Sequence, residues 1–332
     1  MRRRTALAGL AVSGCAHVQQ LPATLPQVLT GAVDDGLDGL IVHVDRKGSP
    51  PQSFAAGWKD RANRTPADPQ ALFKIASISK LYIAAAAAKR VAGGQLALDR
   101  TLTAYLPALS QGLANADRIT LRMLLQHRSG LFNVTDARQF PWFSAHQDVA
   151  QVLDLARGQP ALFEPGARHR YSNTNYLLIG AILDATLGES HQHYIDRELL
   201  APLGLTHTHH RLGQADTAQI VSGRHPAHAG DLKSVDWALP GGSMVATAED
   251  VGRFARALRD GTLLTASEQA VYASIYVYDH TGLLPGYLSI VRHDRELDAV
   301  VVLFANTSAA GGWGQIEAAH TRVARWLHRS AA

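Results

Sequence analysis

The sequence predicts an α/β (α+β) fold: a mixed, mainly antiparallel sheet built from both ends of the chain, with flanking helices and an all-helical subdomain. Two observations predict this class. Apolar runs of strand length lie near both termini, and segments with helical spacing of apolar residues fill the region between them. We therefore expect the sheet part at about 24–76 and 270–330 and the helical part at about 95–235.

Strands and outer helices are expected at both ends. The expected strands are 39–45, 52–58, 287–293 and 297–305, and the expected helices are 25–33 and 316–327. Polar turns at Lys47–Pro50 and Asp294–Glu296 join the strands into two hairpins.

The middle of the chain has the spacing typical of helices. They are expected at 77–92, 121–127, 177–187, 194–200 and 248–258. The first contains five consecutive alanines and is followed by Gly93-Gly94. Alanine is the best helix former and glycine commonly ends a helix, so a helix over 77–92 is expected. Its low polarity predicts burial on most sides. Thr120 and Thr247 are placed to cap two of the others.

The composition indicates a folded protein and argues against nucleic-acid binding. The 332 residues are 46% hydrophobic and 18% charged, which is enough for a large core and excludes a disordered chain. The formal net charge of +4 is small for this length and comes without long basic runs, so no nucleic-acid partner is expected.

The first residues resemble an export signal. Met1–Arg4 is basic, Thr5–Gly14 is a short apolar run, and Cys15, the only cysteine, follows it as in a bacterial lipobox. We expect a signal and tether over 1–20, a folded domain over 21–332, and lipidation at Cys15 that anchors the chain to a membrane. The alternative is a plain secretory signal with an incidental cysteine. Both place the mature protein in the periplasm or cell envelope.

Ser77 and Lys80 are three residues apart at the start of the alanine-rich helix, so they share one face. A lysine in an apolar setting loses hydration and its pKa falls, which lets it take a proton from a neighbouring serine hydroxyl. The pattern has the Ser-x-x-Lys form of the penicillin-recognising serine hydrolases. The alternative is a helix-capping serine followed by a solvated lysine.

Two further motifs carry polar groups suited to a site. Tyr171-Ser172-Asn173 places a phenol and an amide on a loop at a helix start. A phenol near a lysine can relay a proton, and an amide can orient that lysine or a substrate carbonyl. His280-Thr281-Gly282 precedes a predicted hairpin, where a glycine lets a substrate approach the backbone. The alternatives are a capping turn and an ordinary turn into a strand.

Six elements occur in an order and spacing that resemble the serine β-lactamase-related family, which includes class C β-lactamases, DD-carboxypeptidases and esterases. They are Phe73–Lys80, Leu124–Leu131, Tyr171–Tyr176, Pro202–Thr208, Gly241–Ser243 with Thr247–Asp250, and His280–Gly282. The resemblance covers about residues 24–328. It implies a β-lactamase/DD-peptidase-like fold with a cleft between sheet and helical subdomain.

Carried over, the resemblance makes Ser77 the nucleophile of an acyl-enzyme, Lys80 its base and Tyr171 the proton relay. Asn173, His280, Thr281, Gly282 and Leu283 are expected to bind substrate, with the backbone N–H groups of Ser77 and Leu283 forming the oxyanion hole. No cofactor is implied. Candidate partners are a small-molecule or peptide substrate, peptidoglycan, and a membrane through the lipid anchor.

The substrate class stays open among esters, D-amino-acid amides or peptides, and β-lactams. His280 stands where many members have lysine, and Leu283 where many have a small residue. A mostly neutral histidine attracts a substrate carboxylate less than lysine does, so we expect esterase-like activity, with a DD-carboxypeptidase or class C-type β-lactamase as the alternative. The alternative from another class is a catalytically silent cell-wall binding protein.

A cluster of histidines raises the question of a metal site. The cluster comprises His191, His193, His207, His209 and His210. It lacks the aspartate of the metallo-β-lactamase motif and a suitably spaced carboxylate. We therefore expect no metal and take these residues to be solvated loop histidines.

Overall fold

The two ends of the chain share one sheet. The computed structural model describes residues 24–145, 148–309 and 311–331, so Cys15 and the predicted signal lie outside the described residues. The six-stranded antiparallel sheet has the order β3-β2-β1-β9-β8-β7. Its strands are β1 (Gly39–Arg46), β2 (Gln52–Asp60), β3 (Thr65–Pro66), β7 (His280–Leu284), β8 (Tyr287–Asp294) and β9 (Ala299–Ala305). The antiparallel pairing of β1 with β9 joins the N-terminal and C-terminal strands. The predicted fold class is confirmed.

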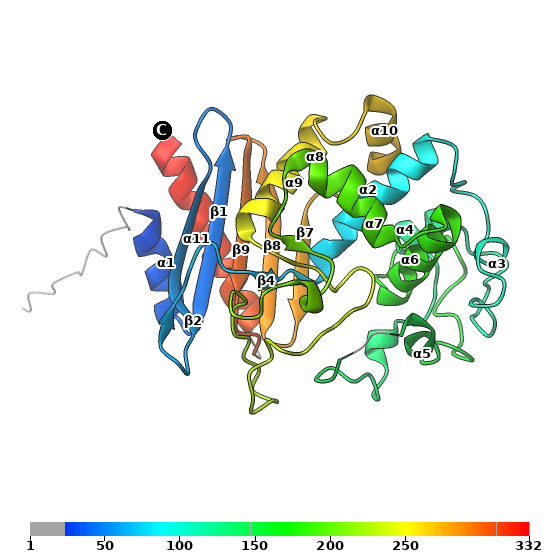
Figure 1. Ribbon diagram of the computed structural model, residues 1–332, viewed down its shortest axis with the longest axis horizontal. Coiled ribbons are helices and arrows are strands. Elements are labelled where there is room, and N and C mark those ends of the chain that lie inside the picture. The colour runs from blue at the N-terminus through cyan, green and yellow to red at the C-terminus, as the bar shows by residue number, and fades with distance from the viewer. Residues whose placement is uncertain (1–23, 146–147, 310, 332) are drawn as a thin grey trace, which may run out of the picture.

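Alternation along the central strands divides the apolar side chains between two cores. Leu40 and Val42 of β1 lie in the core under α1 (Leu25–Asp34) and α11 (Gly312–Ala331). Ile41, between them, lies in the larger core on the opposite face. This is the period of two that a strand buried on both faces shows. Figure 1 shows α1 and α11 together on one side of the sheet.

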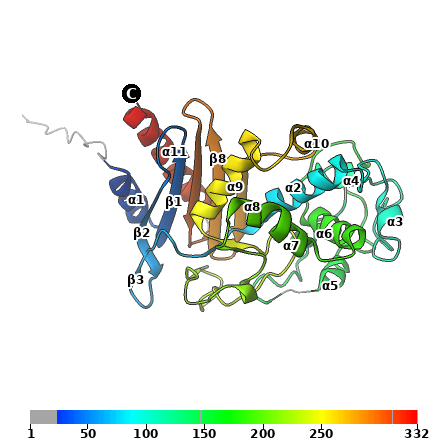
Figure 2. The ribbon, with the colours of Figure 1, turned by 45° about the horizontal axis from the view of Figure 1, so that its top comes forward.

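The opposite face carries the rest of the helices, as Figure 2 shows for α2, α4 and α6. The longer ones are α2 (Ser79–Ala92), α6 (Asn173–Leu187), α9 (Ala248–Asp260) and α10 (Ala266–Ile275). The shorter ones are η1 (Ala76–Ile78), α3 (Leu102–Tyr105), α4 (Leu121–Leu125), η2 (Val134–Asp136), α5 (Val149–Leu153), α7 (His191–Ile195), η3 (Asp196–Leu200), α8 (Ala201–Leu203) and η4 (Leu212–Gln214). No helix in the described part of the chain is long and apolar enough to cross a membrane.

A second, three-stranded sheet connects segments far apart in the sequence. Its order is β4-β6-β5, with β4 (Phe73–Lys74), β6 (Val245–Ala246) and β5 (Thr208–His209). Lys74 pairs with Val245, so the chain just before Ser77 lies beside the chain just after the Gly241–Ser243 motif. The small sheet thereby places two of the six sequence motifs next to each other.

Some element boundaries differ from the prediction. The helices predicted over 77–92 and 194–200 form, but the first begins with the 3-10 turn η1 and the second continues from α7 through the π-turn η3 into α8. Helix α10 was not predicted, because its apolar moment is weak and its strongest signal is the capping box between Thr265 and Glu268. His280-Thr281-Gly282 lies inside the edge strand β7, and the tight turn after Leu284 joins β7 to β8. The alternative of an ordinary turn is wrong.

Candidate active site

Ser77 is presented by an unusual turn at the start of α2. Ala76, directly before it, has a φ of +51°, a conformation that costs a non-glycine residue about 1–2 kcal/mol. Ser77 then lies in η1, and Ile78 occupies the N-cap of α2 without a side-chain capping bond. Ser77 is therefore not a helix cap, and Lys80, only 1% exposed, is not solvated. Both parts of the alternative interpretation of Ser-x-x-Lys are wrong.

The Lys80 ammonium has three partners. Its Nζ lies 3.0 Å from Ser77 Oγ, 2.9 Å from Asn173 Oδ1 and 2.6 Å from the Gly241 carbonyl oxygen. Burial lowers the pKa of Lys80 to about 7. A neutral amine with two N–H groups donates to the amide and carbonyl oxygens and keeps its lone pair for the Ser77 hydroxyl. The geometry thus suits Lys80 as the base.

Gly241 is required at this position. Its φ is +80°, and a Cβ there would lie 2.9 Å from Tyr176 Cβ and 3.0 Å from Lys80 Cγ. Only a residue without a side chain brings its carbonyl this close to the lysine. The Gly241–Ser243 motif therefore supplies an acceptor that helps to hold Lys80, a role that the sequence interpretation did not assign.

Tyr171 lies on the other side of Ser77. Its hydroxyl donates to Ser77 Oγ at 2.8 Å, and the protein around the hydroxyl raises the pKa of the phenol above its ordinary value. The imidazole of His127 stacks on the phenol ring with centroids 4.4 Å apart, and its Nδ1 accepts from the Ser172 N–H at 3.2 Å. Burial lowers the pKa of His127 to about 2, so this ring is neutral. His127 belongs to the Leu124–Leu131 motif and orients Tyr171 through packing.

Asn173 is held from two sides. Its Oδ1 accepts from Lys80, and its Nδ2 donates to Thr135 Oγ1 at 3.0 Å. Its backbone N–H donates to Asn133 Oδ1 at 2.9 Å, which satisfies one of the free N–H groups at the start of α6. Ser172 occupies the N-cap without a side-chain capping bond, so the Tyr-x-Asn motif is more than a capping turn.

Strand β7 closes the site because Gly282 lets it approach η1. A Cβ at Gly282 would lie 2.2 Å from Ser289 Oγ and 2.5 Å from the Ile75 carbonyl oxygen. Any other residue would push β7 away from the turn that carries Ser77. Thr281 contributes a carbonyl oxygen within 2.6 Å of His280 Nδ1.

His280 is neutral and both of its nitrogens have partners. Its Nδ1 faces the Thr281 carbonyl, which only accepts, so this nitrogen carries the proton. Its Nε2 then accepts from the hydroxyl of Tyr276 at 2.7 Å. Burial and the nearby Lys80 lower the pKa of His280 to about 4. Tyr276, which follows the unpredicted helix α10, was missed for lack of any motif.

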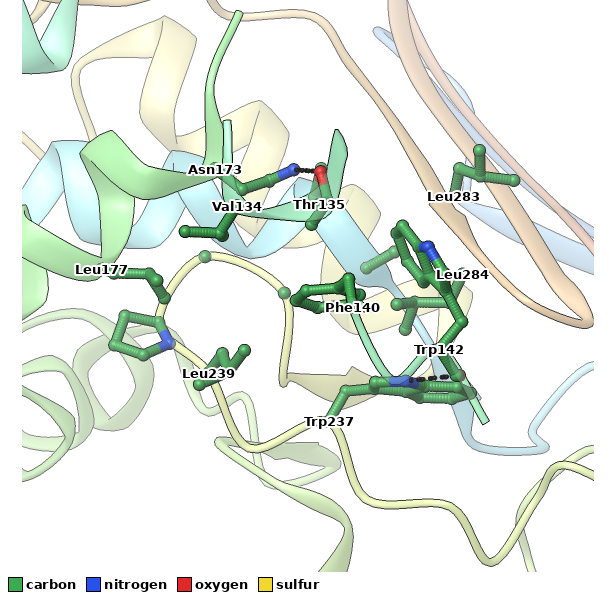
Figure 3. Close-up of a pocket in the computed structure, with 15 residues that line it drawn as sticks. Val134, Thr135, Phe140, Trp142, Asn173, Leu177, Trp237, Leu239, Leu283 and Leu284 are labelled. Atoms are coloured by element: carbon green, nitrogen blue, oxygen red, sulfur yellow. Dashed lines mark hydrogen bonds between the residues drawn. The ribbon is translucent and has the colours of Figure 1, made fainter. Parts of the chain in front are cut away.

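A pocket opens beside Ser77 and encloses about 520 Å³ of non-protein space, its mouth included. Figure 3 shows side chains from several segments around it. Its lining residues include Ser77, Asn173 and Leu283 from the predicted set. Leu283 is 58% exposed although it lines the pocket, so it lies at the mouth. Phe140, Trp142 and Trp237 also line it and were not anticipated, because they lie in loops without a regular pattern.

Two of the five clustered histidines, His191 and His210, are buried, whereas His193 and His207 are exposed as expected. His191 is buried with its Nδ1 2.7 Å from Asp184 Oδ1, and His210 is buried with its Nε2 2.7 Å from Asp196 Oδ1. The expectation of solvated loop histidines is wrong for these two, because each carboxylate comes from a helix that the sequence alone did not place beside them. In the described ranges, no group of three or more histidine, cysteine or acidic residues is placed to hold a metal ion.

Comparison with known proteins relates this chain to several activities. A family model described as Beta-lactamase matches residues 16–275. A candidate D-alanyl-D-alanine carboxypeptidase of Escherichia coli (strain K12) is 31% identical over 146 residues, 41% of this chain and 33% of that protein. A beta-lactamase of Pseudomonas fluorescens is 30% identical over 170 residues, 51% of this chain and 45% of that protein. The chain spans less than half the length of these two curated relatives.

Among solved structures, the D-amino acid amidase from Ochrobactrum anthropi SV3, complexed with L-phenylalanine amide, matches with a TM-score of 0.81. The match covers 93% of this chain and 98% of the amidase at 24% identity, so it shows a shared fold. The family model covers most of the chain, and its range includes Ser77, Lys80 and Tyr171. The chain therefore belongs to the beta-lactamase family, whose members are serine hydrolases.

Proposed function

We propose that this protein is a serine hydrolase that acts through an acyl-enzyme on Ser77, with uncharged esters or amides as preferred substrates. The observation that carries the proposal is the position of the Ser77 hydroxyl between two proton-transfer groups. Lys80 Nζ lies 3.0 Å from Ser77 Oγ, and the Tyr171 hydroxyl lies 2.8 Å from it. A protein that only binds its ligand has no need of a buried lysine and a phenol on one hydroxyl.

In the first step, neutral Lys80 takes the proton of Ser77 as Oγ attacks the substrate carbonyl carbon. The pKa of about 7 leaves roughly half of the lysine neutral near pH 7. Asn173 and the Gly241 carbonyl hold the ammonium that forms, so it does not swing away. The backbone N–H groups of Ser77 and Leu283, at the turn and the strand edge, face the developing oxyanion.

In the second step, the Tyr171 hydroxyl gives its proton to the leaving group as the carbon–heteroatom bond breaks, and Lys80 restores the phenol. Tyr171 has a raised pKa, which keeps it protonated before this transfer. A water molecule then attacks the acyl carbon along the same path in reverse, with the proton passing to Tyr171 and Lys80 and finally back to Ser77. All proton transfers therefore take place among Ser77, Lys80, Tyr171, the leaving group and the attacking water.

The site has little to offer a substrate carboxylate. His280 is neutral, and its two nitrogens are occupied by Thr281 and Tyr276. Leu283 adds an apolar side chain at the mouth. D-Alanyl peptides and β-lactams end in a carboxylate, so both features support esterase-like activity. We expect kcat/KM for p-nitrophenyl acetate or butyrate to exceed that for nitrocefin; the opposite order would contradict this preference.

The decisive experiment is intact-mass spectrometry after brief mixing with a fluorophosphonate or an activated ester. The wild type gains the acyl or phosphonyl mass, and Ser77→Ala gains none. Ser79→Ala is not a neutral control, because Ser79 is buried and its Oγ links the Ala76 carbonyl to the Met244 N–H. Ser274→Ala is the control, because Ser274 is exposed, bonds only within its own helix through Oγ and does not line the pocket. If Ser77→Ala acquires the mass at the wild-type rate, the nucleophile is elsewhere. A wild type that gains no mass and turns over no ester would favour the silent binding protein.

A further inference from the structure

The pocket beside Ser77 lies on the acyl side of the scissile bond. In the proposed function, Tyr171 protonates the leaving group. Among the described residues, neither Tyr171 nor His280 lines the pocket. Ser77 and Asn173 do. Since the leaving group departs toward Tyr171, the part of the substrate that stays on Ser77 points into the pocket.

The pocket wall is apolar and carries no ionisable side chain. Apolar side chains supply most of it: Val134, Phe140, Trp142, Leu177, Trp237, Leu239, Pro240, Leu283 and Leu284. Figure 3 shows Phe140 near the middle, with Trp142 and Trp237 on one side of it and Leu177 and Leu239 on the other. The polar side chains that line it are those of Ser77, Thr135 and Asn173.

The nearest acidic residues in the sequence, Asp136 and Asp236, do not line the pocket. Asp136 follows Thr135, but its Oδ1 accepts from Asn133 and its Oδ2 lies 3.9 Å from Arg170 Nη2. Asp236 precedes Trp237; its Oδ1 is buried without a hydrogen-bond partner among the described residues, and its charge raises the pKa of Lys74 against the effect of burial. The described wall therefore holds neither a carboxylate for a substrate ammonium nor a cation for a substrate carboxylate.

The aromatic part of the wall is held rigidly. Trp237 Nε1 donates to the Trp142 carbonyl oxygen at 3.1 Å, which ties two loops together, as the dashed line in Figure 3 shows. The Lys74 ammonium lies 4.7 Å from the Trp237 ring centre and donates to the carbonyl oxygens of Leu232 and Val235 at 2.7 and 2.6 Å. A preformed apolar wall selects ligands by shape and lack of charge.

From these observations we infer that the pocket takes an uncharged acyl group with an aromatic ring, such as an arylacetyl group, and rejects acyl groups that carry an ammonium or a carboxylate. The inference rests on the proposed function, because it needs an acyl group on Ser77. A ring of this kind gains apolar burial against Phe140 and the two tryptophans. A charge in the same place loses its hydration without a partner.

The test compares four p-nitrophenyl esters: acetate, and three arylacetates whose para substituent is methyl, carboxylate or aminomethyl. We expect kcat/KM for the methyl compound to exceed that for acetate and for both charged compounds by about tenfold or more. Equal values for the three arylacetates, or a preference for a charged one, would overturn the inference.

A matched pair of variants tests whether the discrimination against charged acyl groups arises at this pocket. Leu283→Lys places a cation at the pocket mouth and should raise the carboxylate-to-methyl ratio of kcat/KM about two- to fivefold. Val277→Lys is the control, because Val277 is similarly exposed, at 53% against 58% for Leu283, and does not line the pocket. A ratio that rises equally in both variants would attribute the effect to net charge and overturn the assignment to this pocket.

The two levels of the proposal fail separately. If fluorophosphonate labels Ser77 and acetate is turned over while the arylacetates are not distinguished, the pocket inference is wrong and the proposed function stands. If the wild type is neither labelled nor active on any ester, both are wrong.

Discussion

At the scale of single residues, the site depends on a lysine with three fixed acceptors. Ser77, Asn173 and Gly241 each place an oxygen within 3.0 Å of Lys80 Nζ, in an environment where burial lowers the pKa of the lysine to about 7. Deprotonation costs one of the three donated hydrogen bonds, and the serine hydroxyl can reverse its direction to replace it. The site can therefore hold Lys80 in both its protonated and its neutral form.

This arrangement predicts a pH dependence of acylation. Lys80 accepts a proton only when neutral, so the acylation rate should rise about tenfold per pH unit below about pH 7 and level off above it. His280, with a pKa lowered to about 4, stays neutral across that range. The measurement is the rate of fluorophosphonate labelling between about pH 5 and pH 9. A rate independent of pH would exclude Lys80 as the titrating base.

Substitutions in the catalytic set should be non-additive, because its members act as one unit. Lys80→Ala should cost nearly as much activity as Ser77→Ala, and the double variant little more than either. Tyr171→Phe keeps the ring that stacks on His127 and removes the hydroxyl, so it should lose roughly two to four powers of ten in rate with the fold intact. Kinetics and circular dichroism check this. A Tyr171→Phe variant with wild-type kcat would remove the phenol from the mechanism.

At the scale of elements, the segment from Leu232 to Gly242 connects Lys80 with the pocket. Gly241 at one end accepts from Lys80, and Trp237 in the middle lines the pocket. Lys74 of β4 anchors this segment through two backbone carbonyls. Burial lowers the pKa of Lys74 to about 7 as well, although its amine contacts no group of the catalytic set within the described contacts. The position of Lys74 indicates that it holds the 232–242 segment in place.

Replacing Lys74 should therefore affect binding more than chemistry. In Lys74→Met the two carbonyls lose their donor, which should cost about 1–3 kcal/mol of unfolding free energy. KM for the methyl-substituted arylacetate should rise about three- to tenfold while kcat changes little, since Ser77, Lys80 and Tyr171 keep their contacts. Steady-state kinetics and thermal denaturation measure the two effects.

Lys59→Met is the control for that substitution. Lys59 Nζ also donates to a backbone carbonyl, that of Ala218 at 2.8 Å, but Lys59 does not line the pocket. If both variants lose stability and neither changes KM, Lys74 supports the fold alone.

At the scale of the whole molecule, the sheet joins the N-terminal and C-terminal strands, and the candidate site lies where the helical part meets this sheet. The edge strand β7 packs on the turn that carries Ser77, so residues about 200 positions apart form one site. The pairing of β1 with β9 holds these two parts in register. The N-terminal helix α1 lies on the opposite face, beside α11 (Figure 1).

We propose that Cys15 is acylated and anchors the protein in the bacterial envelope. The motif Val12-Ser13-Gly14-Cys15 after a basic start supports it. Cys15→Ser should move the protein from the membrane fraction to the soluble fraction, and Ser13→Thr is the matched control. Separation of membrane and soluble fractions, followed by immunoblotting, measures the shift. Wild type and Cys15→Ser that are both soluble would contradict the lipoprotein assignment.

The structure brings Ser77, Lys80, Tyr171 and Asn173 together, and part of that proximity is local in the sequence. Ser77 and Lys80 are one turn apart, so helical geometry alone brings them together, and Thr120 and Thr247 cap their helices as expected, accepting from Met123 N and Asp250 N. Tyr276 and Thr135 could not be predicted, because each acts on a motif residue through a contact that only the folded chain creates.

From the sequence by itself followed the fold class, since periodicity encodes local geometry. The set Ser77, Lys80, Tyr171 and Asn173 followed from the resemblance of the ordered motifs to a known family. The tertiary structure alone decided the charge state of the site and the character of the pocket. Burial, which depends on every element packed around a group, lowers the pKa of Lys80 and keeps His280 neutral. The aromatic wall comes from loops with no regular pattern, so the Trp237 indole reaches the Trp142 carbonyl oxygen only in the folded chain.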